Sequence, residues 1–412
     1  MKIKSIALIL IGIMLLAGCS KVDDVSNPSA DSVGSTTSEQ TEPEEEFDLN
    51  KGITSMMKNR SIINEGDLSR LAKVIKKAQA GEEEVVIGVI GGSITQGSSA
   101  QNNNGYATMM QEWWKTKFPN TDFRFINAGI GATDSYIGVH RVKADLLESD
   151  PDLVIIEFSV NDTRAHINKD SYEALVRTIL SHKSEPAAML LFTTQENGTS
   201  FQDVHAPIGE HYNLPMISYK DAILPVISAD HIKWSDISPD NIHPNDAGHD
   251  IIKQLISSFL DDVVAKVDDI DGEYSIPEAN SDKYEGGFIA NANSEEITVL
   301  ETGSFEGDAQ FGNFKDGWAV REGSDSLVFE VEAKNLGILY MEFISGKGAK
   351  AEILVNGEVV KTIDADFPNG WGNYAESVEV FTSDKAEKLK VEIRPVDDEE
   401  RTHFTVLGVM VS

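Results

Sequence analysis

Cysteine is almost absent from this 412-residue chain, whose one cysteine is Cys19. An intrachain disulfide is therefore impossible, and no other thiol is present for nucleophilic chemistry. Basic residues are also few, since 35 Lys and Arg stand against 68 Asp and Glu, for a formal net charge of −33. This charge argues against nucleic acid as a partner and against electrostatic docking on anionic lipid. It is typical of a solubilised surface outside the cytoplasm.

The apolar run at the N-terminus, residues 6–16, is too short to be read as a membrane-spanning helix. Lys2 and Lys4 precede it, and it ends in Leu16-Ala-Gly-Cys19, which resembles the lipobox of bacterial lipoproteins. The resemblance implies that residues 1–18 are a signal peptide and that Cys19 becomes the lipid-modified first residue of the mature chain. The protein would then be extracytoplasmic and held at the cell membrane surface by its lipid alone. The alternative is a plain signal peptide followed by a chance cysteine.

Residues 19–50 are rich in Ser, Thr, Asp, Glu and Pro and have no periodic apolar positions. Such a segment cannot bury enough apolar surface to order itself. We therefore expect a disordered acidic tether between the anchor and the first domain.

Strand-like and helix-like segments alternate over residues 51–268, which predicts a parallel sheet with right-handed crossovers in a three-layer α/β/α sandwich. Asn245 or Asp246 is expected to cap the last helix. The predicted strands cover residues 85–90, 123–127, 153–159, 188–193 and 216–218. The predicted helices cover residues 68–80, 106–117, 135–147, 171–182, 201–212 and 245–267.

The pattern changes after the acidic stretch 268–272, and short alternating runs predict an all-β sandwich domain over residues 284–412. Asn356-Gly357 between two such runs is typical of a hairpin turn. This change suggests a separate folding unit. The expected strands cover residues 297–300, 327–332, 338–344, 351–355, 377–381, 389–394 and 405–411.

Ser93 directly follows a strand-like apolar run and the glycine pair Gly91-Gly92. Glycines let the backbone turn sharply, so Ser93 is expected at the carboxyl end of a central strand. In open α/β sheets this is where ligands bind. A serine hydroxyl at such a position becomes a nucleophile only when a base takes its proton.

His243 is the candidate base, because Asp240 precedes it by three residues. A turn over that distance can place the carboxylate against one ring nitrogen and fix the tautomer of the imidazole. The alternative is that Asp240 only caps a turn. Four other histidines lack this pattern and are expected at the surface or in supporting positions: His205, His211, His231 and His249.

Four blocks in this order resemble the SGNH (GDSL-type) hydrolase family, over about residues 84–262: Gly91-Gly-Ser93-Ile-Thr, Asn127-Ala-Gly-Ile-Gly-Ala-Thr133, Ser159-Val-Asn161-Asp162 and Asp240-Asn-Ile-His243. The resemblance implies a flavodoxin-like fold and a serine esterase that needs no cofactor. It also implies a Ser93–His243–Asp240 triad. The oxyanion hole would use the backbone N–H of Ser93, a backbone N–H of the second block and the side chain of Asn161.

The second and third blocks depart from the family pattern. Either Gly131 or Ala132 can supply the backbone donor, and an alanine there is expected to avoid positive φ. This consideration slightly favours Gly131. Ser159 stands where glycine is frequent and is expected to narrow the pocket floor. Asp162 is expected to order its loop through local hydrogen bonds.

The resemblance and the extracellular location together predict hydrolysis of short acyl esters, above all acetyl, on carbohydrate. No His/Asp cluster has metal-like spacing, so no metal is expected. Trp371 and Tyr374 lie in a Gly/Asn-rich stretch and are candidate sugar contacts, or else core packing. The alternatives are an O-acyltransferase that acts on cell-surface glycan with the same triad, and a glycan-binding surface lipoprotein with a decayed site.

Overall fold

The computed structural model describes residues 45–163 and 165–412, which belong to one compact unit. Cys19, the predicted signal peptide and most of the predicted tether lie outside the described residues. The packed chain begins before residue 51, because the Phe47 side chain is buried and its backbone N–H donates to His231 Nδ1 at 3.1 Å. None of the helices in the described part is both long and apolar enough to cross a membrane.

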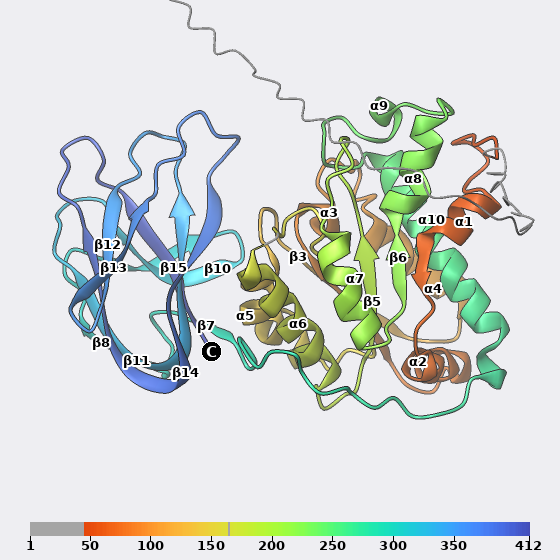
Figure 1. Cartoon of the computed structure of the whole chain (residues 1–412), viewed down its shortest axis with the longest axis horizontal. Helices are drawn as coiled ribbons and strands as arrows, with labels where there is room; N and C mark the ends of the chain where they lie inside the picture. Colours follow the sequence, from red (N-terminus) through yellow and green to blue (C-terminus); the bar gives the residue numbers. More distant parts are fainter. Residues whose placement is uncertain (1–44, 164) are drawn as a thin grey trace, which may run out of the picture. The chain divides into compact units, whose positions relative to one another are not determined.

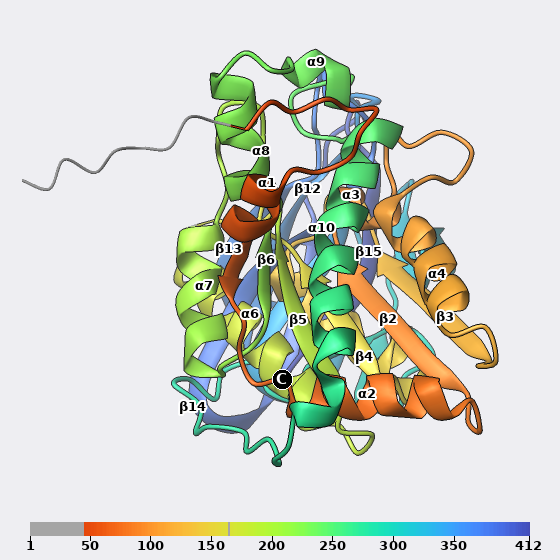
Figure 2. The same ribbon diagram turned by 90° about the vertical axis from the view of Figure 1, so that its right-hand side faces the viewer.

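The first domain is built on a six-stranded sheet (Figures 1 and 2). Five strands are parallel, in the order β6-β5-β4-β2-β3, and β1 pairs antiparallel with β6 at the edge. The strands are β1 (Ile62–Asn64), β2 (Val85–Gly91), β3 (Phe123–Gly129), β4 (Leu153–Glu157), β5 (Ala187–Phe192) and β6 (Met216–Ser218). The strand order reverses at β2, so a switch point lies at its carboxyl end.

Helices cover both faces of this sheet, which confirms the predicted α/β/α sandwich. One core includes residues of α1 (Ser55–Ser61), α2 (Ser69–Ala80), α4 (Tyr106–Lys117), α8 (Tyr219–Ser228), α9 (Trp234–Ile237) and α10 (Asp246–Ala265). The other includes residues of α5 (Ser135–Asp145), α6 (His166–Leu180) and α7 (Gln202–His211). The cap of α10 is Asn245, whose side chain accepts from the N–H groups of Ala247 and Gly248.

The second domain is all-β, as predicted, and its named strands pair antiparallel in one hydrogen-bonded sheet whose two halves share a single core. Its strands are β7 (Phe288–Ala290), β8 (Ile297–Glu301), β9 (Glu306–Phe311), β10 (Phe314–Val320), β11 (Leu327–Glu342), β12 (Lys350–Val355), β13 (Glu358–Asp364), β14 (Tyr374–Pro395) and β15 (Phe404–Val411). Asn356 and Gly357 both have positive φ, 52° and 88°, as a type I′ turn between β12 and β13 requires.

Two pairs of predicted strands are continuous in the structure. Residues 327–332 and 338–344 were expected as separate strands, yet β11 runs through Lys334 and Asn335 with register shifts on either side of Asn335. The same holds for 377–381 and 389–394 within β14. The bulges absorb the break in alternation without ending the strand.

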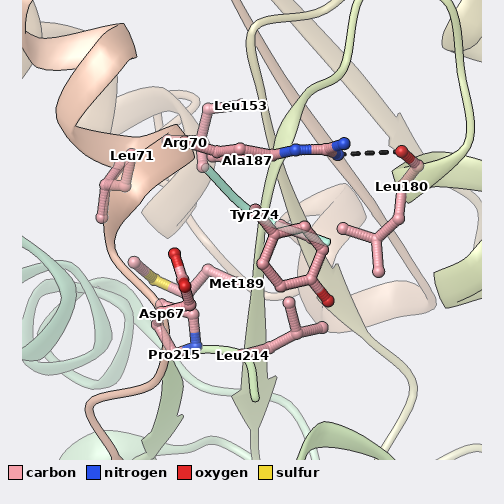
Figure 3. A pocket seen from close by; sticks show the side chains of 11 residues that line it. Asp67, Arg70, Leu71, Leu153, Leu180, Ala187, Met189, Leu214, Pro215 and Tyr274 are labelled. Carbon is pink, nitrogen blue, oxygen red and sulfur yellow. Dashed lines mark hydrogen bonds between the residues drawn. The ribbon is translucent and has the colours of Figure 1, made fainter. Parts of the chain in front are cut away.

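The segment between the domains is tied to the first domain. Arg177 pairs with Glu285, and Glu173 Oε1 accepts from both the backbone and the side chain of Asn280. Figure 3 shows Tyr274 beside Arg70, whose guanidinium lies 5.0 Å from the ring centroid. The small cavity around them lies near Leu153 and Ala187, at the amino ends of β4 and β5 and therefore opposite Ser93.

The two domains share a hydrophobic core. Phe314, Leu407 and Met410 of the β domain belong to the same buried cluster as Tyr136 and Val139 of α5. The separate folding of the β domain stays a prediction, and the structure shows that its apolar side chains pack in one cluster with those of α5. The acidic stretch marks a change of secondary structure, but the apolar face of α5 is completed only by the second domain.

Candidate active site

Ser93 lies where β2 ends and the short helix α3 (Ser93–Gln96) begins. The two residues before it must be glycines, because neighbouring atoms approach their backbone too closely for a side chain. A Cβ at Gly91 would collide with the backbone oxygen of Glu157, and one at Gly92 would collide with the side chain of Asn161. The glycine pair therefore brings the Ser93 backbone against the end of β4.

A continuous hydrogen-bonded chain joins the three predicted triad residues. Ser93 Oγ lies 2.9 Å from His243 Nε2, and His243 Nδ1 lies 2.8 Å from Asp240 Oδ2. A carboxylate only accepts, so Nδ1 carries the proton and Nε2 presents a lone pair to the serine hydroxyl. The arrangement lets the Ser93 hydroxyl donate to Nε2 of this ring.

The pKa of Asp240 is lowered. Burial alone would raise it, but hydrogen bonds from the backbone and ring of His243 and from the backbone of Ile242 outweigh burial. Asp240 Oδ1 accepts both backbone N–H groups at 2.7 Å. The carboxylate is thus held ionised against the ring whose tautomer it fixes.

Two residues that the sequence reasoning missed fix the Asp240–His243 turn. Trp234 Nε1 donates to the Asp240 carbonyl at 2.6 Å. Ser238 Oγ lies within hydrogen-bond distance of the carbonyls of Asp240 and His243, at 2.7 and 2.6 Å. One feature of the sequence indicated this role, namely that both residues lie within a few positions of Asp240.

The second block brings Ala132, rather than Gly131, forward as the free donor. Gly131 N–H donates to Gln96 Oε1 at 3.0 Å, whereas Ala132 N–H makes no hydrogen bond to any described residue. Ala132 has a φ of 58°, so the expectation that an alanine here avoids positive φ is wrong. Thr133 closes this turn, because its N–H and Oγ1 both donate to the Ile130 carbonyl.

Asn161 packs its side-chain amide against Gly92, the residue before Ser93. Its Oδ1 is buried without a hydrogen-bond partner, and its Nδ2 donates to no described residue. The amide therefore lies beside Ser93 with hydrogen-bonding capacity unused by the protein. The structure thus brings Ser93, Ala132 and Asn161 to one edge of the sheet.

Ser159, just after the end of β4, belongs to a buried polar network. It is fully buried, and its Oγ accepts from the Thr193 N–H at 2.7 Å and lies 3.2 Å from Glu157 Oε1. Burial raises the pKa of Glu157, although Thr193 and Ser159 donate to it. Glu157, a charged residue at the end of the apolar run 153–157, was the feature of the sequence that could have predicted this buried network.

Asp162 makes one local hydrogen bond, from its backbone N–H to the Phe158 carbonyl at 3.0 Å, while its side chain is held by distant partners. It accepts the Ser135 N–H at 2.7 Å and contacts His205 Nε2 at 2.8 Å. His205 is buried on α7, and His249 is buried on α10, where its Nδ1 accepts from the Tyr106 N–H. His211 is exposed, in agreement with the expectation that it lies at the surface or in a supporting position.

Trp371 and Tyr374 lie in the loop before β14 and at its first residue. Trp371 is 70% exposed, and its ring centroid lies 5.1 Å from that of Tyr374 and 6.3 Å from that of Phe367.

The pKa of Asp134, which caps α5 just after the second block, is raised to about 7 by burial and by the charge of Asp162, with a smaller contribution from Glu376 of β14. Ala375 at the start of β14 belongs to the same buried cluster as Tyr136 of α5, the helix that follows the loop of Ala132.

Comparison with known proteins agrees with this geometry. The profile of the GDSL-like lipase/acylhydrolase family matches residues 89–251. A two-domain esterase (CEX) active on acetylated mannans, co-crystallised with mannopentaose, is 36% identical, with a TM-score of 0.80 over 86% of this chain and 97% of that one. A further structure of such an esterase, with 36% identity over 86% of this chain and 98% of that one, gives a TM-score of 0.78.

The search of curated proteins found no match. The similarity to the two-domain esterase extends over nearly that protein's whole length. The family profile covers all four motif blocks and leaves out the first residues of β2 and the last turns of α10. The chain therefore belongs to the GDSL-like lipase/acylhydrolase family and is a carboxylic ester hydrolase.

Proposed function

We propose that this protein is an extracytoplasmic serine esterase that removes short acyl groups, above all acetyl, from carbohydrate through an acyl-serine intermediate. The observation that carries the mechanism is the chain of hydrogen bonds Ser93–His243–Asp240 beside donors that the protein leaves unused. The activity of the 36%-identical two-domain esterase on acetylated mannans supports acetylated polysaccharide, mannan first, as the substrate.

In the acylation step, His243 Nε2 takes the proton of the Ser93 hydroxyl as Oγ attacks the ester carbonyl. The developing oxyanion accepts hydrogen bonds from the backbone N–H groups of Ser93 and Ala132 and from Asn161 Nδ2. The imidazolium, stabilised by Asp240, then protonates the departing sugar hydroxyl. Water, deprotonated by His243, hydrolyses the acyl-serine and restores the hydroxyl of Ser93.

The test is acetate release from acetylated mannan, with acetylated xylan and 4-nitrophenyl acetate, butyrate and octanoate for comparison. We expect acetate from mannan and faster turnover of the acetate ester than of the octanoate. No release from any of these substrates would refute the proposal. Transfer of acetyl to an added mannooligosaccharide, in preference to water, would identify an O-acyltransferase instead.

Trp371 gives a prediction about polymeric substrate. With 70% of the residue exposed, its ring is free to stack on a sugar, so Trp371→Ala should lower kcat/KM on acetylated mannan by about three- to tenfold, the effect of one aromatic contact of roughly 0.5–1.5 kcal/mol. Turnover of 4-nitrophenyl acetate and the melting temperature should not change.

Val359→Ala is the matched control, because Val359 is another exposed apolar residue of the β domain, on β13. It should leave both activities as they are. Equal losses by Trp371→Ala on mannan and on the small ester would instead mean that the loop shapes the cleft.

Cys19 gives a prediction about location, although it lies outside the described residues. If the lipobox is used, Cys19→Ser will leave the protein unprocessed or move it from the membrane fraction to the soluble fraction. Fractionation followed by mass spectrometry of the mature N-terminus measures both. Unchanged membrane fractionation together with an unchanged processed N-terminus in the Cys19→Ser protein would refute the lipid anchor.

A further inference from the structure

His205 and Asp162 form a buried pair that the catalytic mechanism does not use. His205 Nε2 lies 2.8 Å from Asp162 Oδ2, and both side chains are completely buried. The two residues are 43 positions apart, on α7 and in the loop after β4. Burying a carboxylate is costly unless it is paired, so the contact is one that the fold must maintain.

The same carboxylate joins the two loops that carry the proposed oxyanion donors. Asp162 directly follows Asn161 in the chain. Its other oxygen, Oδ1, accepts the backbone N–H of Ser135 at 2.7 Å, and Ser135 is the first residue of α5, three positions after Ala132. One side chain thus sets the spacing between the third block and the second.

His205 in turn determines where this carboxylate lies. Among the described residues, it is the one group that donates to Asp162 Oδ2. Its ring stacks on Tyr172 with 3.7 Å between centroids and an interplanar angle of 3°, while its Nδ1 has no partner in the described part of the chain. Because the carboxylate accepts, the proton is on Nε2, and the ring's one polar contact is with Asp162.

We propose that His205 is a positioning residue for the oxyanion hole, which acts by holding Asp162 so that Asn161 keeps its place opposite Ala132. The inference rests on the proposed function, in which Asn161 stabilises the oxyanion. Without the Nε2 donor, the buried Oδ2 must turn toward another donor or admit water, and the adjoining Asn161 backbone moves with it. A transition state is more sensitive to such a shift than substrate binding is.

A matched pair of variants separates this role from packing. His205→Phe keeps a ring that can stack on Tyr172 but removes the donor, whereas His205→Gln loses the ring and keeps an N–H near the Nε2 position. We expect His205→Phe to lower kcat for 4-nitrophenyl acetate by about 10- to 100-fold, short of the full loss of an oxyanion donor, with KM within about twofold. His205→Gln should retain kcat within about fivefold of the wild type.

The double variant Asn161→Ala/His205→Phe tests whether His205 acts on catalysis through Asn161. If His205 acts through Asn161, the His205→Phe change should lower kcat by less than about threefold once the amide is gone. Melting temperatures are recorded for every variant. If His205→Phe does not fold, His205→Leu replaces it, because it also removes the Nε2 donor and differs from His205→Gln mainly in lacking a polar group, and the same loss in kcat is expected.

The outcomes are distinct. Wild-type kcat in folded His205→Phe, equal losses in the Phe and Gln variants, or fully additive losses in the double variant would each overturn the positioning role. An inactive wild-type protein would instead overturn the proposed function. An active wild type with an active His205→Phe variant leaves that function standing and removes only the inference.

Discussion

Ser93→Ala is expected to lower kcat for 4-nitrophenyl acetate by about 10⁴- to 10⁶-fold, and His243→Ala by a similar factor. Each variant breaks the hydrogen bond of 2.9 Å between Oγ and Nε2, the first by removing the nucleophile and the second by removing its base. The two side chains act as a unit, so the double variant should be little worse than either single one. Steady-state kinetics with a burst-phase assay measure both the turnover and the acyl-enzyme.

His211→Ala is the matched control for the histidine, since His211 is exposed on α7 and lies outside the triad. It should retain full activity. A loss of less than about tenfold in folded Ser93→Ala or His243→Ala would contradict the triad, because the residual activity would require another nucleophile or base.

Asn161→Ala should lower kcat by about 10²- to 10³-fold and leave KM nearly unchanged, the usual effect of removing one oxyanion-hole donor. The physical reason is that charge on the carbonyl oxygen develops only in the transition state, so the amide contributes little to binding the ground state. The side-chain amide lies against Gly92, the residue before Ser93, and its Nδ2 donates to no described residue. Initial rates over a range of ester concentrations separate the two constants.

Asn293→Ala, at an exposed asparagine of the β domain, is the control for changes in the preparation and should behave as the wild type. An effect of Asn161→Ala confined to KM would mean that Asn161 holds the substrate without stabilising the oxyanion.

The architecture and the meeting of Ser93 with His243 could be predicted because local signals determine them. An apolar strand that ends in glycines places Ser93 at the carboxyl edge of the sheet, and loops that follow parallel strands meet at that edge. The Asp240–His243 contact spans three residues, so its geometry depends on one turn. The Asn356-Gly357 turn was predictable for the same reason.

Contacts between distant elements could not be predicted in this way. Whether His205 lies at the surface or against Asp162 depends on how α7 packs on β5 and β6, which no local pattern of α7 encodes. The positive φ of Ala132 runs against the local preference of alanine, and a strained conformation of this kind costs about 1–3 kcal/mol that the surrounding contacts must outweigh. Tertiary contacts determine both the place of His205 and the backbone conformation of Ala132.

The shared core of the two domains bears on how the protein is made. Synthesis proceeds from the N-terminus, so α5 and the sheet behind it leave the ribosome long before Phe314, Leu407 and Met410, which complete their apolar cover. During that interval the nascent chain exposes an apolar surface, which favours aggregation or binding by chaperones. We therefore expect a chain that ends before β15 to expose the apolar face of α5 and to be a substrate for quality-control proteases.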